Sequence, residues 1–384
     1  MSLKFHPRVD QLEPFLAMEV MERAFAMERE GARVIHFGVG EPGVAPPPEA
    51  VDACVAALRG GETRYTDSRG LVELRRAVAA EQARLSGQAV DPGQVLVTSG
   101  TSPAMLLVFG LLAGPGDEII LGTPHYPCYP NFIRFCGGTP VFVATGPGDG
   151  WQLDPAAVRA AVTPRTRAIV VGSPANPTGA VQAAETLDAL GTLGPPLISD
   201  EIYHGLTYDG VQAASALGRA EHVFVLDGFS KRYAMTGFRL GYAVVPPAAL
   251  RKLQVMQQNL FISANRFVQH AGVAALEHGA PMVERLRKSL DGRRLRMVEG
   301  LRELGLGVEH PPQGAFYVFA DARRFGSDSL RLAFDILERA QVACTPGIDF
   351  GAAGEGFLRF SYAASDADLE EGLKRLARAL PALA

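Results

Sequence analysis

The chain has 384 residues, of which 47% are hydrophobic and 20% are charged, and its formal net charge is −4 at pH 7. This length and composition are typical of a globular protein with two domains and exclude a disordered chain. The small charge argues against a nucleic-acid partner or a membrane-surface partner. The N-terminus lacks the apolar core of a signal peptide, and no apolar run approaches the roughly 20 residues of a membrane span. We therefore expect a cytoplasmic protein.

The spacing of cysteines and histidines does not indicate a metal site. The four cysteines are scattered and include no CxxC pair, so we expect free thiols in a reducing compartment. The eight histidines also lack the spacing of metal ligands, and we expect no bound metal. The cysteines are Cys54, Cys128, Cys136 and Cys344.

Up to about residue 246, short β-branched runs alternate with amphipathic stretches. An N-terminal helix is expected at 15–30 and a strand at 34–40. Further strands are expected at 95–98, 118–121, 140–144, 168–172, 196–200, 223–227 and 240–245, and helices at 102–113, 127–136, 154–161 and 183–193. Runs such as AIVVG are apolar on both faces, as buried parallel strands are, and the gaps are long enough for crossover helices. The sequence thus predicts an α/β fold with a mostly parallel seven-stranded sheet.

Beyond residue 246 the pattern changes to long helices followed by a mixture of strands and helices. The helices are expected at 247–259, 266–278, 282–304, 329–339 and 366–379, and the strands at 314–320 and 357–362. This pattern predicts a smaller α+β domain. We expect a large domain at 46–285, and a small domain at 286–384 that is joined by an N-terminal arm at 1–45.

The most informative segment is DGFSKRYAMTGFRLG, residues 227–241. It places Lys231 among small residues after an expected strand, where open α/β sheets bind ligands. The pattern resembles the lysine signature of class I aminotransferases, which have the pyridoxal-phosphate (PLP) fold type I. The resemblance implies that Lys231 carries PLP as a Schiff base and that Arg239 binds its phosphate. The family often has a phosphate-binding serine where this chain has Gly228, so that contact is absent or supplied by Ser230.

Two segments upstream match the same family. LISDEIY, residues 197–203, resembles the segment whose carboxylate pairs with the pyridine nitrogen of PLP and whose tyrosine contacts the phenolic oxygen. The resemblance assigns these roles to Asp200 and Tyr203. A buried anion keeps the ring nitrogen protonated, which makes the ring an electron sink. In the NPTG segment, residues 176–179, the resemblance implies that Asn176 also contacts the phenolic oxygen.

The segment VTSGTSPA ends an expected strand and opens a helix. Small residues before a helix N-terminus let backbone N–H groups and hydroxyls hold a phosphate. The matching family segment binds the PLP phosphate, which implies Gly100, Thr101 and Ser102 as ligands. In GTPHYPCYP the resemblance implies that the ring of Tyr126 stacks on PLP, and we expect the neighbouring His125 to be an ordinary loop residue.

Three further segments concern the substrate and a second subunit. GFLRFSY alternates like a strand and buries one arginine, which needs an anion. The resemblance makes Arg359 the clamp for the substrate α-carboxylate, aided by Asn176, and makes Gly40 a backbone contact in a loop that closes over the substrate. Tyr65, in GETRYTDSRG, resembles the tyrosine that reaches the PLP phosphate of a neighbouring subunit. This match predicts a homodimer with shared active sites.

The resemblance implies a ping-pong aminotransferase that takes amino-acid and 2-oxo-acid substrates. Lys231, Asp200 and Tyr203 are its expected catalytic residues. A PLP-dependent carbon–sulfur β-lyase on the same scaffold and a non-catalytic PLP-binding regulatory module are the alternatives.

The specificity for the substrate side chain is less defined by the sequence. Asn259 aligns near the position where dicarboxylate-specific relatives have a cation, and the helix after Ser102 contains no lysine. We therefore expect no strict preference for aspartate, with glutamate and 2-oxoglutarate as one substrate pair. Whether Asn259 or one of Arg64, Arg69 and Arg266 lines the distal pocket stays open.

Overall fold

Seven strands form the main sheet of the computed structural model, which describes residues 3–38 and 40–383. They are β2 (Val95–Thr98), β3 (Glu118–Thr123), β4 (Thr139–Ala144), β5 (Thr166–Gly172), β6 (Leu197–Asp200), β7 (Val223–Gly228) and β8 (Gly241–Val244). Their order is β2-β8-β7-β6-β5-β3-β4. Strand β8 is antiparallel to both neighbours, and the other pairs are parallel. The predicted mostly parallel seven-stranded sheet is confirmed.

Helices cover both faces of this sheet. They are α2 (Pro48–Arg59), α3 (Val72–Ser86), α4 (Thr101–Leu112), α5 (Cys128–Phe135), α6 (Pro155–Ala161), α7 (Ala184–Gly191), α8 (Pro247–Leu260) and α9 (Arg266–His278). Successive side chains of β2 point to opposite faces of the sheet and pack against different helices. Val95 and Val97 pack with residues of α3 and α9, whereas Leu96 packs with residues of α4 and α5. Covering both faces explains why the strands are apolar on both sides.

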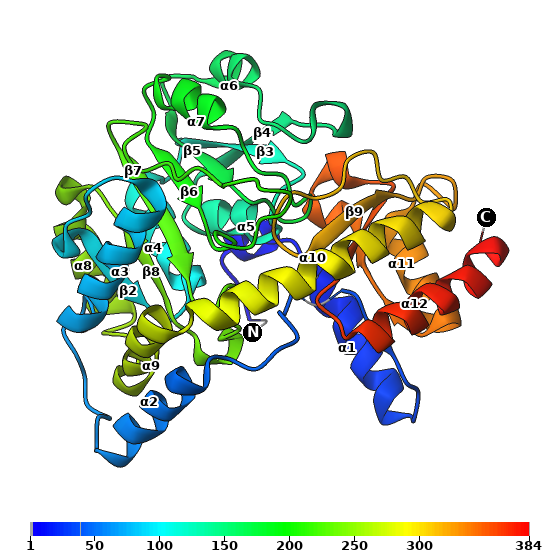
Figure 1. Cartoon of the computed structure of the whole chain (residues 1–384). Helices are drawn as coiled ribbons and strands as arrows, with labels where there is room; N and C mark the ends of the chain where they lie inside the picture. Colours follow the sequence, from blue (N-terminus) through cyan, green and yellow to red (C-terminus); the bar gives the residue numbers. More distant parts are fainter. Residues whose placement is uncertain (1–2, 39, 384) are drawn as a thin grey trace.

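The remaining elements form a second group, to the right in Figure 1. The helices are α1 (Leu16–Arg29), α10 (Ala280–Glu303), α11 (Ser329–Ala340) and α12 (Asp366–Ala379), and the strands are β1 (Ile35–His36), β9 (Tyr317–Asp321), β10 (Val342–Ala343), β11 (Thr345–Pro346) and β12 (Phe357–Ser361). Strands β11, β12 and β9 form an antiparallel sheet, and β1 pairs in parallel with β10. The N-terminal strand therefore lies with C-terminal elements. The domain limits at 45/46 and 285/286 stay a prediction.

Most predicted strand limits are within two residues of the observed ones, but two strands differ by three residues or more at one end. The strand expected at 34–40 ends at His36, because the following backbone turns towards the side chains of Arg359 and Lys231, which donate to the carbonyls of Gly38 and Gly40. The strand expected at 314–320 begins only at Tyr317. The residues before it form an isolated bridge and a turn with a positive φ.

Across 3–38 and 40–383, no helix is long and apolar enough to cross a membrane. All four cysteines are free thiols.

Candidate active site

A cavity of about 440 Å³ opens where β3, β5 and β6 end and where the chain leaves β7. The carboxyl ends of parallel strands are the usual ligand site of an open α/β sheet. Most residues that the sequence singled out line this cavity together. They are Gly40, Thr101, Ser102, Tyr126, Asn176, Asp200, Tyr203, Ser230, Lys231, Arg239 and Arg359.

Lys231 follows β7 by three residues and extends into the cavity. Its Nζ donates a hydrogen bond to the carbonyl oxygen of Gly40 at 2.5 Å. Burial, and then the positive charge of Arg359, lowers the pKa of Lys231 to about 8. A lysine with this pKa is partly neutral near physiological pH, so its amine can act as a nucleophile or as a base.

Asp200 is the last residue of β6 and is buried. One carboxylate oxygen accepts a hydrogen bond from the Tyr129 hydroxyl at 2.6 Å, and the other accepts from the backbone N–H of Ile202 at 3.2 Å. Burial raises the pKa of Asp200 to about 6, against the opposing effect of these two hydrogen bonds. The sequence reasoning missed Tyr129. Its position in the same GTPHYPCYP segment, three residues after Tyr126, was the available signal.

Two tyrosines meet beside Lys231. The hydroxyls of Tyr203 and Tyr317 lie 2.8 Å apart, and both side chains are buried. Tyr317 is on β9, so this hydrogen bond joins the small sheet to the segment after β6. The Tyr317 ring also lies under the guanidinium of Arg359, 4.3 Å from the ring centroid to Cζ. From the sequence, no role was assigned to Tyr317.

The N-terminus of α4 and Arg239 form a cationic corner of the cavity. Gly100 precedes the helix with φ 96°, and the Arg239 guanidinium lies so close that a Cβ at position 100 would overlap it. Only glycine fits both conditions. The free backbone N–H groups of the first turn and the guanidinium together attract an anion. Ser230 is buried and lines the cavity, whereas a Cβ at Gly228 would lie 3.0 Å from the Cα of Gly241, a close contact.

Arg359 lies on β12 and is 3% exposed. It donates hydrogen bonds to Asn176 Oδ1 at 2.8 Å, to the Gly38 carbonyl at 2.6 Å and to Thr345 Oγ1 at 3.0 Å. Its Nε has no hydrogen-bond partner among residues 3–38 and 40–383. These acceptors are neutral, so a buried positive charge remains without an anion. The arrangement favours binding of a carboxylate.

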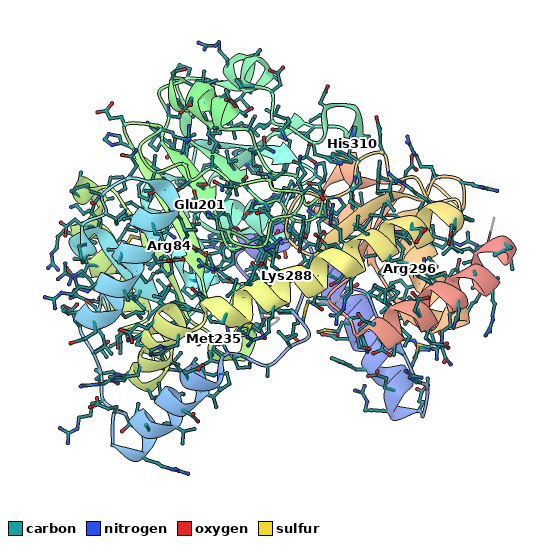
Figure 2. The ribbon with its side chains drawn as sticks, in the orientation of Figure 1. Arg84, Glu201, Met235, Lys288, Arg296 and His310 are labelled. Carbon is teal, nitrogen blue, oxygen red and sulfur yellow. The ribbon has the colours of Figure 1, made fainter. Side chains whose placement is uncertain are left out.

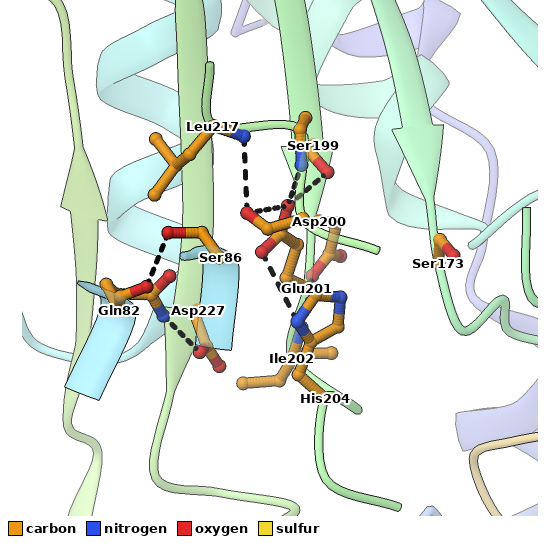
Figure 3. Close-up of polar contacts among 12 residues, drawn as sticks. Gln82, Ser86, Ser173, Ser199, Asp200, Glu201, Ile202, His204, Leu217 and Asp227 are labelled. Carbon is orange, nitrogen blue, oxygen red and sulfur yellow. Dashed lines mark hydrogen bonds and ion pairs between the residues drawn. The ribbon is translucent and has the colours of Figure 1, made fainter. Parts of the chain in front are cut away.

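Glu201 and Asp227 belong to a buried polar cluster at the ends of β6 and β7 (Figure 3). Glu201 is fully buried, in the interior (Figure 2), and accepts hydrogen bonds from the hydroxyls of Ser199 and Ser215. Asp227 accepts from Gln82 and Tyr242 at 3.0 and 2.8 Å. Burial raises the pKa of both carboxyl groups to about 7. The cluster fixes the ends of the two strands from which Asp200 and Lys231 extend.

The remaining residues from the sequence analysis differ in their position, because Tyr65 and Asn259 do not line this cavity whereas His125 does. Tyr65 is 77% exposed, in the segment between α2 and α3. His125 lines the cavity, but burial lowers its pKa to about 4, so it is neutral. Asn259 is exposed, with its amide bonded to the Val255 carbonyl.

The three arginines considered for the distal pocket do not line it within one chain. Arg64 is exposed, Arg69 lies near Asp67, and Arg266 pairs with Glu62.

The fold and the grouping of these residues agree with comparisons with known proteins. A family model described as "Aminotransferase class I and II" matches residues 32–376, and the chain belongs to this family. It is a PLP-dependent enzyme that transfers an amino group between an amino acid and a 2-oxo acid. This confirms the expected transaminase function over the two alternatives.

The relatives are similar over nearly their whole length. The chain is 38% identical over 380 residues to the aspartate/prephenate aminotransferase of Thermus thermophilus, covering 97% of this chain and 98% of that protein. It is 37% identical over 376 residues to the valine–pyruvate aminotransferase of Mycobacterium tuberculosis, covering 96% of each. A solved structure of the Thermus thermophilus aspartate aminotransferase with maleate superposes with a TM-score of 0.94 at 38% identity, covering 98% of this chain and 100% of that one.

The residues in the cavity fit PLP. The cofactor brings a phosphate, a pyridine nitrogen and an aldehyde, and the cavity offers the Gly100–Arg239 corner, the buried Asp200 carboxyl and the Lys231 amine. Arg359, with its unpartnered Nε, remains for the carboxylate of a substrate.

Proposed function

We propose that Lys231 holds PLP covalently and is the base of the transamination. The observation that carries this proposal is the placement of Lys231 and Asp200 at the same end of the adjacent strands β6 and β7, in one cavity. No other lysine lines the cavity within the described residues. Its lowered pKa, about 8, suits both roles.

The proposed roles of the other residues follow from the charge of each side chain and from its position in the cavity. Asp200 keeps the pyridine nitrogen protonated, and Tyr129 holds the Asp200 carboxylate in place. The first turn of α4, from Thr101 and Ser102, binds the phosphate with Gly100 and Arg239. PLP, when bound, supplies an electron sink for the charge left at the substrate Cα. The Nζ of Lys231 takes the proton from that carbon.

Four residues contact the cofactor ring or complete its surroundings. The ring of Tyr126 stacks on the cofactor, and Ser230 adds a hydroxyl beside the phosphate corner. Asn176 and Tyr203, which line the cavity, donate hydrogen bonds to the phenolic oxygen in this proposal. The Tyr203 hydroxyl is held by Tyr317.

The substrate α-carboxylate binds Arg359 in this proposal. The guanidinium is held in position by Thr345 and by Asn176, so little side-chain entropy is lost on binding. The backbone of Gly40 lies over the same space and contacts Lys231. These contacts fix the substrate with its Cα near the lysine amine.

Substitution of the lysine tests the proposal. Lys231→Ala removes the covalent contact and the base, so we expect a loss of transamination by about three orders of magnitude. Borohydride reduction followed by peptide mass spectrometry is expected to place the cofactor on Lys231 in the native enzyme. Lys252→Ala, an exposed site on α8, is the matched control and is expected to leave both results unchanged. Label on another lysine, or full activity of Lys231→Ala, would contradict the proposal.

We further propose a cytoplasmic homodimer. The free thiols support a reducing compartment. The exposed hydroxyphenyl ring of Tyr65, which does not line the cavity of its own chain, supports the prediction that it completes the phosphate site of a partner subunit.

A further inference from the structure

We infer that the amino-acid substrate of this cavity has a large apolar side chain, aromatic or long aliphatic. The inference rests on the proposed function, in which Arg359 holds the α-carboxylate and Lys231 holds the cofactor. It concerns the part of the cavity that lies beyond these two residues.

Among the described residues of one chain, the cavity has no free cationic side chain that could pair with a second substrate carboxylate. Among the described lining residues the cationic side chains are Lys231, Arg239 and Arg359, and each already has a role. His125 is neutral because burial lowers its pKa to about 4. The acidic side chain of Glu41 also lines the space. A distal carboxylate would lose its hydration and gain no counter-charge from the described residues of its own chain, which disfavours aspartate and glutamate.

Apolar side chains of the N-terminal segment form one wall of the cavity, which we call the apolar wall. Phe15, Met18 and Met21 line the cavity from the start of α1 and the residue before it. The ring of Phe15 meets the ring of Tyr126 edge-on, with centroids 6.2 Å apart. Methionines adapt to irregular apolar shapes and make favourable contacts with aromatic rings. This wall therefore suits a bulky apolar group.

Trp151 adds another apolar surface. Its ring contacts Phe319 and Phe357 edge-on, with centroid distances of 5.6 Å to each. These two phenylalanines belong to β9 and β12, the strand that carries Arg359. The tryptophan is therefore held in a fixed position beside the small sheet.

The apolar wall is fixed next to the carboxylate clamp. The carboxylate oxygens of Asp349 accept hydrogen bonds from the backbone N–H groups of Leu16 and Ala17 at 2.8 and 3.1 Å. Its neighbour Phe350 has its ring centroid 5.0 Å from Cζ of Arg359. Asp349 thus holds the start of α1, and the next residue, Phe350, contacts the guanidinium of Arg359. A substrate bound by Arg359 has the apolar wall within reach of its side chain.

A panel of amino acids tests the inference on the purified holoenzyme. Half-reactions with L-phenylalanine, L-tyrosine, L-leucine and L-methionine are compared with those of L-aspartate, L-glutamate and L-alanine. We expect kcat/KM at least about tenfold higher for the best apolar amino acid than for either dicarboxylic one. As a readout without catalysis, 3-phenylpropanoate is expected to bind more tightly than succinate.

Two variants localise the effect. Phe15→Ala is expected to lower kcat/KM for L-phenylalanine by roughly tenfold or more and to leave that for L-alanine within about twofold. Phe25→Ala removes an equivalent ring from the exposed side of α1 and is expected to change neither value.

The outcomes separate this inference from the proposed function. If L-aspartate or L-glutamate reacts faster than every apolar amino acid, or if succinate binds more tightly, the inference is wrong and the transaminase role of Lys231 is untouched. If Lys231→Ala retains full transamination, the proposed function is wrong. An equal loss for both substrates in Phe15→Ala would also refute the wall as the specificity element.

Discussion

Among the described residues, the hydroxyl of Tyr129 is the single side-chain donor to Asp200, at 2.6 Å. Burial raises the pKa of Asp200 to about 6, and this hydrogen bond opposes the rise. Tyr129→Phe removes the donor, so the pKa of Asp200 should rise further, by about one unit. Because the ionised carboxylate is the active form, the acid limb of the kcat/KM profile should move to higher pH. Activity near pH 6 should fall roughly fivefold, because the ionised fraction drops from about one half to about one tenth.

A pH–rate profile of the holoenzyme from pH 5 to 9 measures this shift. Tyr233→Phe is the matched control, since Tyr233 is also buried and does not line the cavity. A Tyr129→Phe enzyme with an unchanged acid limb and normal stability would show that the hydrogen bond does not tune Asp200.

At the scale of residues, the sequence predicts best those that sit in continuous motifs. Lys231 and Arg239 share one fifteen-residue segment, and both line the cavity. Tyr129 and Tyr317 could not be assigned in this way, because their partners are 71 and 114 residues away. Asp349, 333 residues from Leu16, is a more extreme case. Such pairs form only when the fold brings distant elements together.

At the scale of elements, the start of α1 depends on a cap from elsewhere in the chain. Phe15, at the N-cap position, makes no side-chain cap, and Asp349 accepts from Leu16 and Ala17 instead. Asp349→Asn puts an amide in place of one acceptor oxygen and should destabilise the helix start by about 1 kcal/mol. We expect faster amide hydrogen exchange in residues 15–22 and a higher KM for bulky apolar substrates.

The helix α11 offers a control of the same chemistry. Asp328 caps it locally, by accepting from the N–H of Arg331 at 2.9 Å, and does not line the cavity. Asp328→Asn should cost similar stability and leave KM unchanged. If both variants change KM alike, the effect of Asp349 is a general loss of stability and the cap has no special link to the site.

The elements differ in how well the sequence predicted them. The limits of α9 and α12 were predicted to the residue because each has a full amphipathic pattern and an end marked by a glycine or a capping serine. The strand β1 has only two residues and is held by pairing with β10, and no local pattern records that pairing. The limits of α2 and α3 were not predicted.

At the scale of the whole molecule, Tyr65 raises the question of whether the site belongs to one chain or two. The side chain is 77% exposed and does not line the cavity of its own chain, whose phosphate corner is formed by Gly100 and Arg239. In the proposed homodimer, the two-fold axis places each Tyr65 at the site of the other chain, so that each site takes its lysine and its tyrosine from different chains.

Mixing two inactive variants decides between these arrangements. In Tyr65→Ala the sites keep Lys231 but lose the partner's hydroxyl, and in Lys231→Ala they lose the lysine but their subunits still donate Tyr65. A mixed dimer then has one complete site, with Lys231 from one chain and Tyr65 from the other. Refolding the two variants together in equal amounts should restore about a quarter of the native activity, because half of the dimers are mixed. If Tyr65 acted within its own chain, co-refolding would give no more activity than the two variants refolded separately.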